Sequence, residues 1–299
     1  MRRAAIAIGS NSTRMLCADT VNGYLSNLVR GREETKLFLG LDAEGRIRPE
    51  RLEETARAVE RLYNAARDAG AVQTDLLATS ASRDAVNSDQ LAARIRELCG
   101  LNMRVISGEE EAALAFRAVS EGKRRLVMDI GGGSTEWTLG DKNRVLWSVS
   151  MQLGASRLLR QKPIYSLADA EEILTTARAV MAPHAEALRA LAPAEGMIGL
   201  GGSCTTLAAL EMGREAHGDE VEGRYVTRAD AEKWLSILSP LPLEKRREVP
   251  GLPPSRAEHM PHGLCIFIAA MEACGFPGLT VSGKTNLDGY LSSLPDGTA

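Results

Sequence analysis

The sequence predicts an α/β protein built from two similar domains, and three features support this prediction. Short apolar runs alternate with helical patterns along the 299 residues, which is typical of sheets flanked by helices. A glycine turn in DIGGGSTE, at 129–136, joins two strand patterns. When the sequence is aligned with itself at an offset of about 122 residues, AIAIGSNSTRMLCAD matches VMDIGGGSTEWTLGD. The hairpin pattern therefore occurs twice. We therefore expect one domain over residues 1–122 and a second over 123–299, with mixed sheets, a cleft between them, and a terminal helix that packs back on the first domain.

The first half of the chain alternates strand and helix patterns. Proline in the first turn, apolar residues at helical spacing and a stop at Gly70 support the longest helix. In order, the expected elements are a hairpin over Arg3–Thr20, a strand at Leu37–Leu41, a helix over Pro49–Ala69, a strand at Asp75–Thr79, a loop at 80–84, a helix capped by Ser88, a strand at Met103–Ile106 and a helix that starts with Glu109.

The second half repeats this alternation after its hairpin. A glycine loop, Gly201–Cys204, leads into a helix whose amino end offers free N–H groups to an anion. In order, the expected elements are a helix over Leu167–Leu191, a strand at Met197–Leu200, the helix after the glycine loop, an exposed loop over Gly213–Thr227, a strand at Leu279–Ser282 and a helix around Leu287–Leu291.

Composition excludes several classes of protein. A hydrophobic content of 44% and a charged content of 25% describe an ordinary soluble protein, and a net charge of -3 gives no reason to expect nucleic acid or an anionic membrane as a partner. No apolar run approaches the roughly 20 residues of a membrane span, and the start of the chain lacks the apolar core of a signal peptide. The five cysteines are scattered without CxxC spacing, which argues against disulfides and zinc. A cytoplasmic protein is expected.

The glycine turn suits phosphate. Three glycines can take positive φ and bring backbone N–H groups directly to an anion. Asp129 before the turn and Glu136 after it are expected near one edge of the hairpin, where two carboxylates can share a divalent cation that bridges to phosphate. The first hairpin breaks the symmetry, because Ala7 stands where Asp129 stands in the second.

Six motifs in order along the chain resemble the Ppx/GppA family of exopolyphosphatases and guanosine pentaphosphate phosphohydrolases. The resemblance is strongest from Ile8 to Leu207, and the chain is similar to the short, two-domain members of this family. The family belongs to the sugar kinase, Hsp70 and actin superfamily, so the resemblance implies two ribonuclease-H-like domains. The motifs are IGSNSTR at 8–14, TSASRDAVN at 79–87, ISGEEEA at 106–112, DIGGGSTE at 129–136, QLGASRL at 152–158 and GLGGSCTTLA at 199–208.

This resemblance implies hydrolysis of a terminal phosphoanhydride. It assigns Glu111 as the general base that takes a proton from the attacking water, and Asp129 and Glu136 as ligands of Mg, with Mn as the alternative metal. The substrate would be polyphosphate or a guanosine penta- or tetraphosphate, and the sequence leaves open both this choice and the choice between monomer and homodimer. The residues expected to bind phosphate are Ser10, Asn11, Ser12, Arg83, Gly131, Gly132, Gly133 and Ser134, with Gly202 and Ser203 added for the helix start that follows them.

Two departures from the family pattern support an alternative function. The family usually has aspartate at the position of Ala7, and an Arg-Glu-Gly triplet where this chain has Leu287, Asp288 and Gly289. A sensor that binds polyphosphate or guanosine tetraphosphate with weak or no turnover is therefore the alternative. An ATP-using kinase of the same superfamily is a third possibility, but no separate aspartate that would activate an acceptor is evident.

Several of these residues also have simpler interpretations. Glu109–Glu111 can be an acidic first turn that complements the helix dipole, and only the family match singles out Glu111. Arg83 can form a surface ion pair with Asp84 or Glu110. The Gly201–Ser203 loop can be a tight turn with a serine cap. His259 and His262 suggest a metal pair, but we expect surface histidines, because no acidic or cysteine partner follows at ligand spacing.

Overall fold

The computed structural model describes residues 1–142, 144–191 and 194–295, and the chain divides into two compact units. Unit 1 comprises Met1–Ala118 together with the segment that starts at Thr285, and unit 2 comprises Val119–Lys284. The chain therefore passes between the units after Ala118 and again after Lys284, whereas the sequence analysis placed the first boundary after residue 122 and expected the terminal helix to pack back on the first domain.

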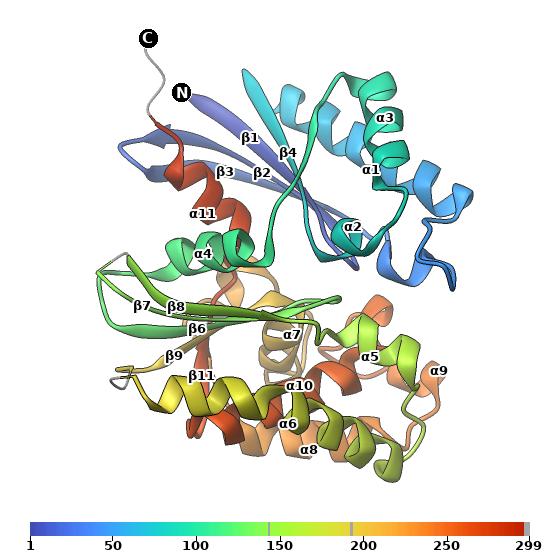
Figure 1. Ribbon diagram of the computed structural model, residues 1–299, viewed down its shortest axis with the longest axis vertical. Helices are drawn as coiled ribbons and strands as arrows, with labels where there is room; N and C mark the ends of the chain where they lie inside the picture. The colour runs from blue at the N-terminus through green and yellow to red at the C-terminus, as the bar shows by residue number, and fades with distance from the viewer. Residues whose placement is uncertain (143, 192–193, 296–299) are drawn as a thin grey trace. The chain divides into compact units, whose positions relative to one another are not determined.

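Unit 1 contains a five-stranded mixed sheet with the order β3-β2-β1-β4-β5 (Figure 1). The first three strands are antiparallel neighbours, and β4 and β5 continue the sheet in parallel with β1. The strands are β1 (Arg2–Ile8), β2 (Thr13–Val21), β3 (Tyr24–Glu33), β4 (Gln73–Ala78) and β5 (Met103–Val105). The helices are α1 (Pro49–Asp68), α2 (Ser80–Asp84), α3 (Ser88–Cys99), α4 (Gly108–Val119) and α11 (Asn286–Ser293), with a 3-10 turn at Phe38–Gly40.

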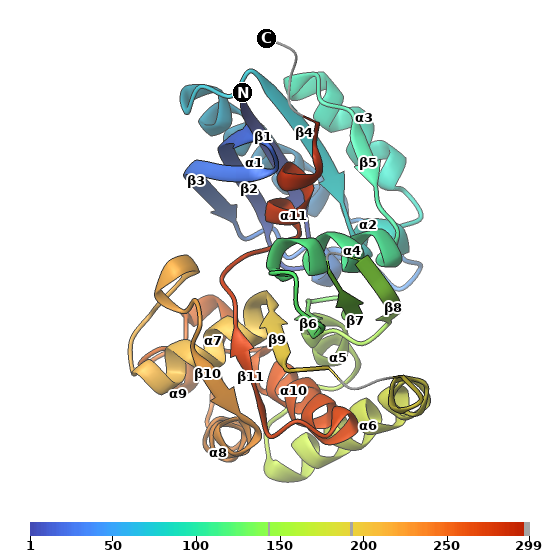
Figure 2. The same cartoon turned by 90° about the vertical axis from the view of Figure 1, so that its left-hand side faces the viewer.

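Both faces of this sheet are covered, because successive side chains of a strand point to opposite faces. Ala4, Ile6 and Ile8 of β1 belong to the apolar cluster that includes α1 and α3. The alternate residues Ala5 and Ala7 belong to a second cluster, formed with apolar residues of α4 and α11. Figure 2 shows α11, the last helix of the chain, lying against the sheet of unit 1.

Unit 2 repeats the same pairing scheme in a six-stranded sheet, β10-β11-β9-β6-β7-β8. Here β6, β7 and β8 form the antiparallel meander, and β9 and β11 follow in parallel with β6. The strands are β6 (Arg125–Ile130), β7 (Thr135–Asp141), β8 (Arg144–Met151), β9 (Met197–Leu200), β10 (Tyr225–Thr227) and β11 (Gly278–Val281). The helices are α5 (Ala155–Gln161), α6 (Leu167–Arg189), α7 (Gly201–Met212), α8 (Arg228–Leu238), α9 (Leu243–Arg246) and α10 (Met260–Cys274), with 3-10 turns at Gly218–Glu220 and Pro254–Arg256.

Three local expectations were wrong. Leu37–Leu41 forms a 3-10 turn in place of a strand, because the amides of Lys36 and Phe38 bond to the first hairpin turn. Residues 80–84 form the short helix α2 and not a loop. The segment 213–227, expected as a loop, contains a 3-10 turn and the edge strand β10. The five cysteines are all free, as expected, and none of the described helices is long and apolar enough to cross a bilayer.

Helix α11 is fixed to the rest of unit 1 by an ion pair between the enclosed Asp288 and the partly exposed Arg30. Asp288 accepts hydrogen bonds from both terminal nitrogens of Arg30, at 3.1 and 2.6 Å. The same carboxylate accepts bonds from the backbone N–H and hydroxyl of Thr285, which closes the capping box of the helix. The Asp288 side chain is only 7% exposed. Its carboxylate accepts hydrogen bonds both from the start of the helix and from the Arg30 guanidinium.

We predict that Asp288→Ala lowers the free energy of unfolding by about 1–2 kcal/mol, because it removes the helix cap and the partner of Arg30 at once. Urea denaturation followed by circular dichroism would measure this change. The matched control is Glu97→Ala, which removes an exposed partner of Arg94 in the same unit and should change stability by less than about 0.5 kcal/mol. Equal effects of the two substitutions would contradict this account of α11.

Candidate functional site

The glycine turn of unit 2 directs its carbonyl groups inward. Gly131 N–H donates to the Ser134 carbonyl at 2.9 Å, which closes the turn. The carbonyl of Gly131 accepts from Ala155 N–H at 3.1 Å, and the Gly132 carbonyl accepts from Arg157 N–H at 3.0 Å. Within the described residues, the N–H groups of Gly132 and Gly133 meet no acceptor. These N–H groups therefore form the kind of nest that binds an anion.

The first hairpin has the same arrangement in unit 1. Gly9 N–H donates to the Ser12 carbonyl at 3.1 Å. The carbonyls of Ser10 and Asn11 accept from the amides at 36 and 38, each at 2.9 Å. Ser12 is fixed from the side, because its hydroxyl accepts from Arg32 Nε at 3.1 Å. The two turns, which match in the sequence alignment, thus have the same pattern of hydrogen bonds: their carbonyl groups accept from a following segment of the chain.

Asp129 and Glu136 are directly paired across β6 and β7. Paired residues of adjacent strands present their side chains on the same face, and two like charges placed this way repel each other unless a cation lies between them. Glu136 is 3% exposed, and its Oε1 accepts from the Ser150 hydroxyl at 2.7 Å. The sequence expectation that these carboxylates lie near one edge of the hairpin is confirmed in position.

This pair fits magnesium better than zinc. In the described part of the chain, no group of three or more His, Cys, Asp or Glu side chains is placed to hold a metal ion. Zinc sites use three or four protein ligands. Magnesium is commonly held by one or two carboxylates, with waters and phosphate oxygens completing its shell. Asp129 and Glu136 would be the protein ligands of such an ion.

The corresponding position in unit 1 carries no carboxylate. Ala7 pairs with Arg14 across β1 and β2, in the register that Asp129 and Glu136 occupy in unit 2. Ala7 is 6% exposed and belongs to an apolar cluster that also contains Leu287. Ala7 and Leu287, two of the positions at which the chain departs from the family pattern, therefore lie in one packed apolar region.

The amino end of α7 faces Asp129 in unit 2. Gly201, at φ 84°, has no side chain to collide with this carboxylate, and a Cβ there would lie 2.5 Å from Asp129 Oδ1. A Cβ on Gly202 would overlap the guanidinium of Arg256, which is 8% exposed. No side chain caps this helix start, so its first N–H groups are available to an anion. The sequence did not predict Arg256 as a site residue, because no local pattern shows that its side chain lies against Gly202.

The three glutamates of α4 have different surroundings. Glu110 is partly exposed and pairs with Arg104 at 2.6 Å. Glu111 is 12% exposed, and its Oε2 accepts from Arg83 Nη1 at 3.0 Å. Glu109 is exposed. Arg83 therefore pairs with neither of the surface partners considered for it, and Glu111 is the most enclosed carboxylate of the three.

The two histidines are buried, which contradicts the expectation of surface histidines. His259 is 7% exposed and His262 is fully buried. His262 Nε2 bonds to the Lys162 carbonyl at 2.8 Å, which fixes the ring at the start of α10. Burial, together with the nearby Arg246, lowers the pKa of His262 to about 4. His262 is therefore a neutral packing residue of unit 2 and not part of a metal pair.

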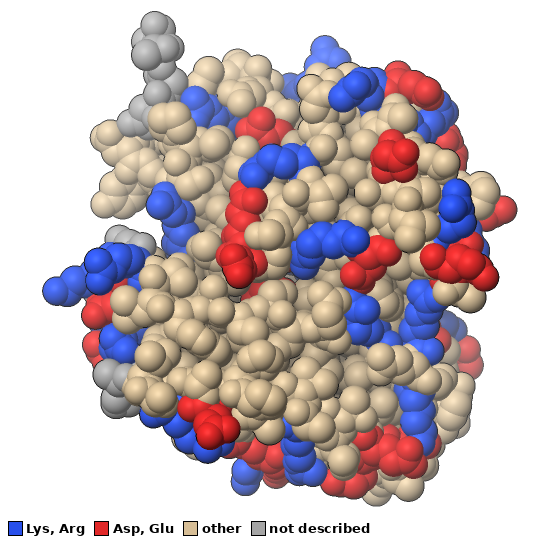
Figure 3. Space-filling model, in the orientation of Figure 1, with Lys and Arg blue, Asp and Glu red and all other residues tan. Residues whose placement is uncertain are grey.

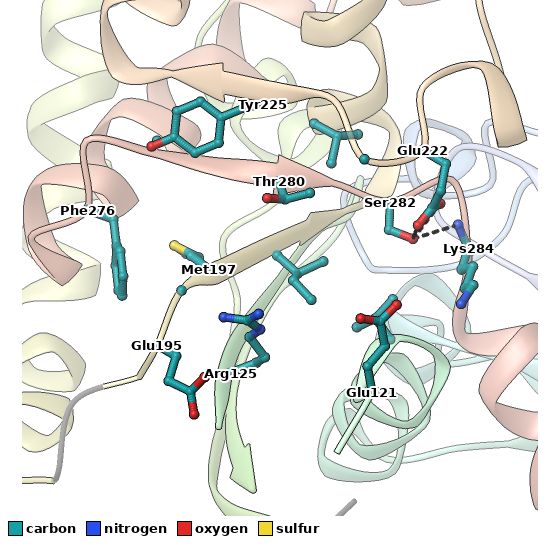
Figure 4. Close-up of a pocket in the computed structure, with 16 residues that line it drawn as sticks. Glu121, Arg125, Glu195, Met197, Glu222, Tyr225, Phe276, Thr280, Ser282 and Lys284 are labelled. Atoms are coloured by element: carbon teal, nitrogen blue, oxygen red, sulfur yellow. Dashed lines mark hydrogen bonds between the residues drawn. The ribbon is translucent and has the colours of Figure 1, made fainter. Parts of the chain in front are cut away.

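A separate cavity of about 610 Å³ lies in unit 2, along β11 and beside the amino ends of β6 and β9 (Figure 4). It is lined by Arg125 and Lys284 but also by Glu121, Glu195 and Glu222, so its charges do not suit a polyanion. None of the predicted site residues lines it. On the face drawn in Figure 3, basic and acidic side chains are likewise interspersed.

Comparisons with known proteins agree on one family. A family model described as the Ppx/GppA phosphatase family matches residues 16–294. The chain is 32% identical over 316 residues to Exopolyphosphatase 2 of Mycobacterium tuberculosis, with 98% of each protein covered.

Solved structures give the same result. A Ppx/GppA family member from Aquifex aeolicus is similar with a TM-score of 0.80 and 27% identity, over 98% of this chain and 97% of that one. An exopolyphosphatase from Cytophaga hutchinsonii is similar with a TM-score of 0.88 and 25% identity over the full length of both chains. The predicted fold class, two ribonuclease-H-like domains with mixed sheets flanked by helices, is confirmed.

The buried histidine predicts a pH dependence of stability. The His262 pKa is about 4 in the folded chain and near 6.5 when unfolded, so the unfolded state binds more protons between these values. Stability should therefore fall as the pH is lowered from 6.5 to 4, by up to about 3 kcal/mol. Denaturation at a series of pH values would show this slope, and His262→Gln should flatten it. His184→Gln, on α6, is the control and should keep the slope; an unchanged slope in His262→Gln would contradict the assignment.

Proposed function

We propose that this chain removes the terminal phosphate of inorganic polyphosphate. The chain belongs to the Ppx/GppA phosphatase family and is a hydrolase of phosphoanhydride bonds, which supports this proposal. The observation that carries the proposal is the pair of matching turns, each with its carbonyl groups bonded inward and its N–H groups available to an anion. Guanosine pentaphosphate presents the same bond to the same groups, and we include it as a second substrate.

In this proposal Glu111 is the general base. Water is a poor nucleophile near neutral pH, and a carboxylate that takes its proton as the new P–O bond forms lowers the barrier. The bond to the bridging oxygen breaks, and the shortened polyphosphate leaves as the anion. The position of Glu111, enclosed and held by Arg83, supports this role over the exposed Glu109 and the surface-paired Glu110.

Phosphate oxygens would be bound by the two turns and by the start of α7. The turn residues are Ser10, Asn11 and Ser12 in unit 1 and Gly131–Ser134 in unit 2, with Gly202 and Ser203 at the helix start. Arg256, against Gly202, adds a positive charge there. Asp129 and Glu136 would hold Mg, or Mn in its place, which supplies positive charge to the oxygens of the reacting phosphate. The proposed base belongs to unit 1 and the proposed metal ligands belong to unit 2.

A sensor function is the second candidate, and one observation favours it. Ala7 and Leu287, which replace charged residues of the family pattern, are both buried in the same apolar cluster. If the protein only binds, ligand at a hundredfold excess over its dissociation constant stabilises the fold by about 2.7 kcal/mol while no phosphate is released. Phosphate release with Mg, with Mn and with EDTA distinguishes the two functions.

Glu111→Gln should lower kcat for phosphate release from polyphosphate by about 10²- to 10⁴-fold, because the amide cannot accept the proton of water. Stabilisation of the fold by polyphosphate should persist, since the substrate-binding turns are intact. Glu109→Gln, on the same helical turn, is the matched control and should keep wild-type kcat. Full turnover by Glu111→Gln would exclude Glu111 as the base.

Asp129→Asn should raise the Mg concentration needed for half-maximal phosphate release by about 10-fold or more, because a neutral amide replaces one of two charged ligands. Titration of activity with Mg would measure the shift. Asp141→Asn, at the far end of β7, serves as the control and should leave the titration unchanged. A titration of Asp129→Asn that overlays the wild-type curve would remove Asp129 from the metal site.

A further inference from the structure

One terminal nitrogen of Arg83 uses both of its hydrogens within the protein. Arg83 Nη1 donates to the Ile106 carbonyl at 2.8 Å and to Glu111 Oε2 at 3.0 Å. A terminal guanidinium nitrogen carries two hydrogens, so this nitrogen has no further donor capacity. The buried Nη2 has no hydrogen-bond partner among the described residues. The contact with Glu111 therefore uses the one nitrogen that is also fixed to the backbone.

The anchor for this contact is rigid. Ile106 is 1% exposed, and its N–H donates to the Ala78 carbonyl at the end of β4, at 2.9 Å. Its carbonyl then receives Arg83, which lies in α2 immediately after the same strand. The connection from β4 through Ile106 and Arg83 to Glu111 is therefore continuous. A glutamate has three rotatable side-chain bonds, and this connection reduces the freedom of the carboxylate.

The same contact places a positive charge beside the carboxylate. An arginine at 3.0 Å and the amino end of α4 both favour the ionised form of Glu111, which is the form that can accept a proton. Arg83 contacts Glu111 through Oε2, at 3.0 Å.

We propose that Arg83 is a positioning residue that acts through Glu111, in addition to any contact of its Nη2 with phosphate. This inference rests on the proposed function, because it requires Glu111 to be the base. It makes Arg83 responsible for the orientation and ionisation of the base. A role confined to gripping phosphate would act on substrate affinity and would be independent of Glu111.

A double-mutant cycle tests this inference. Arg83→Met should lower kcat by about 10²-fold in the wild-type background, because a misplaced base loses near-attack geometry. In the Glu111→Gln background the same substitution should change kcat by less than about twofold, since the residue through which Arg83 acts is already gone. An equal loss in both backgrounds would overturn the inference.

The pH profile of kcat gives a second readout. Loss of the adjacent cation makes the carboxylate easier to protonate, so the acidic limb in Arg83→Met should move to higher pH by about one unit. A limb that does not move, together with a raised KM, would show that Arg83 acts on phosphate alone. Arg83→Lys retains the charge but has no planar fork; it should lower kcat and leave the acidic limb within a few tenths of a unit, and it is used if Arg83→Met fails to fold.

The matched control is Arg104→Met. It removes the arginine partner of Glu110 one residue earlier on the same helix, at 2.6 Å, and should leave kcat, KM and the acidic limb unchanged. Failure of this inference can be told from failure of the proposed function. Full turnover by Glu111→Gln refutes the proposed base, whereas an inactive Glu111→Gln with additive effects of Arg83→Met refutes the positioning role only.

Discussion

The candidate site depends on the polarity of two backbone turns. A hairpin turn can direct either its carbonyl groups or its N–H groups toward solvent, and only the second arrangement attracts an anion. In both units a following segment bonds the turn carbonyls: the amides of Ala155 and Arg157 in unit 2, and the amides at 36 and 38 in unit 1. Arg157 adds a bond from its Nε to the Gly133 carbonyl at 2.6 Å. The direction of the N–H groups is therefore set by packing behind the turn.

The duplicated fold has diverged where the two hairpins carry charge. Unit 2 presents two paired carboxylates, whereas unit 1 presents Ala7 beside Arg14 in the same register. Two carboxylates favour a cation, while an arginine beside an alanine cannot hold one and instead adds positive charge. Ala7, 6% exposed, instead packs in the apolar cluster that contains Leu287. In the proposed function, the paired carboxylates that would hold a metal therefore belong to one hairpin only, whereas both hairpins offer turn N–H groups to an anion.

The sequence predicted the parts of the site that depend on local pattern. Glycine spacing and the internal repeat located both turns, and the pairing of Asp129 with Glu136 follows from a hairpin of known length. The strand β3 was missed, because YLSNLVRGRE shows no alternation and is held mainly by pairing with β2. The burial of His262 was missed for a related reason. Its partner is a backbone carbonyl 100 residues away, which no local pattern reveals.

The three adjacent glutamates show what long-range packing adds to a motif. As sequence, Glu109–Glu111 is an acidic first turn whose members are equivalent for the helix dipole. The fold separates them because one helical turn points its side chains in different directions, and an arginine from another element is within reach of only some of them. Arg104 reaches Glu110 at the surface, and Arg83 reaches Glu111 where exposure is 12%. Enclosure lowers the local dielectric and strengthens the effect of the neighbouring charge, so a change at Arg83 should act on its glutamate far more strongly than a change at Arg104 acts on Glu110.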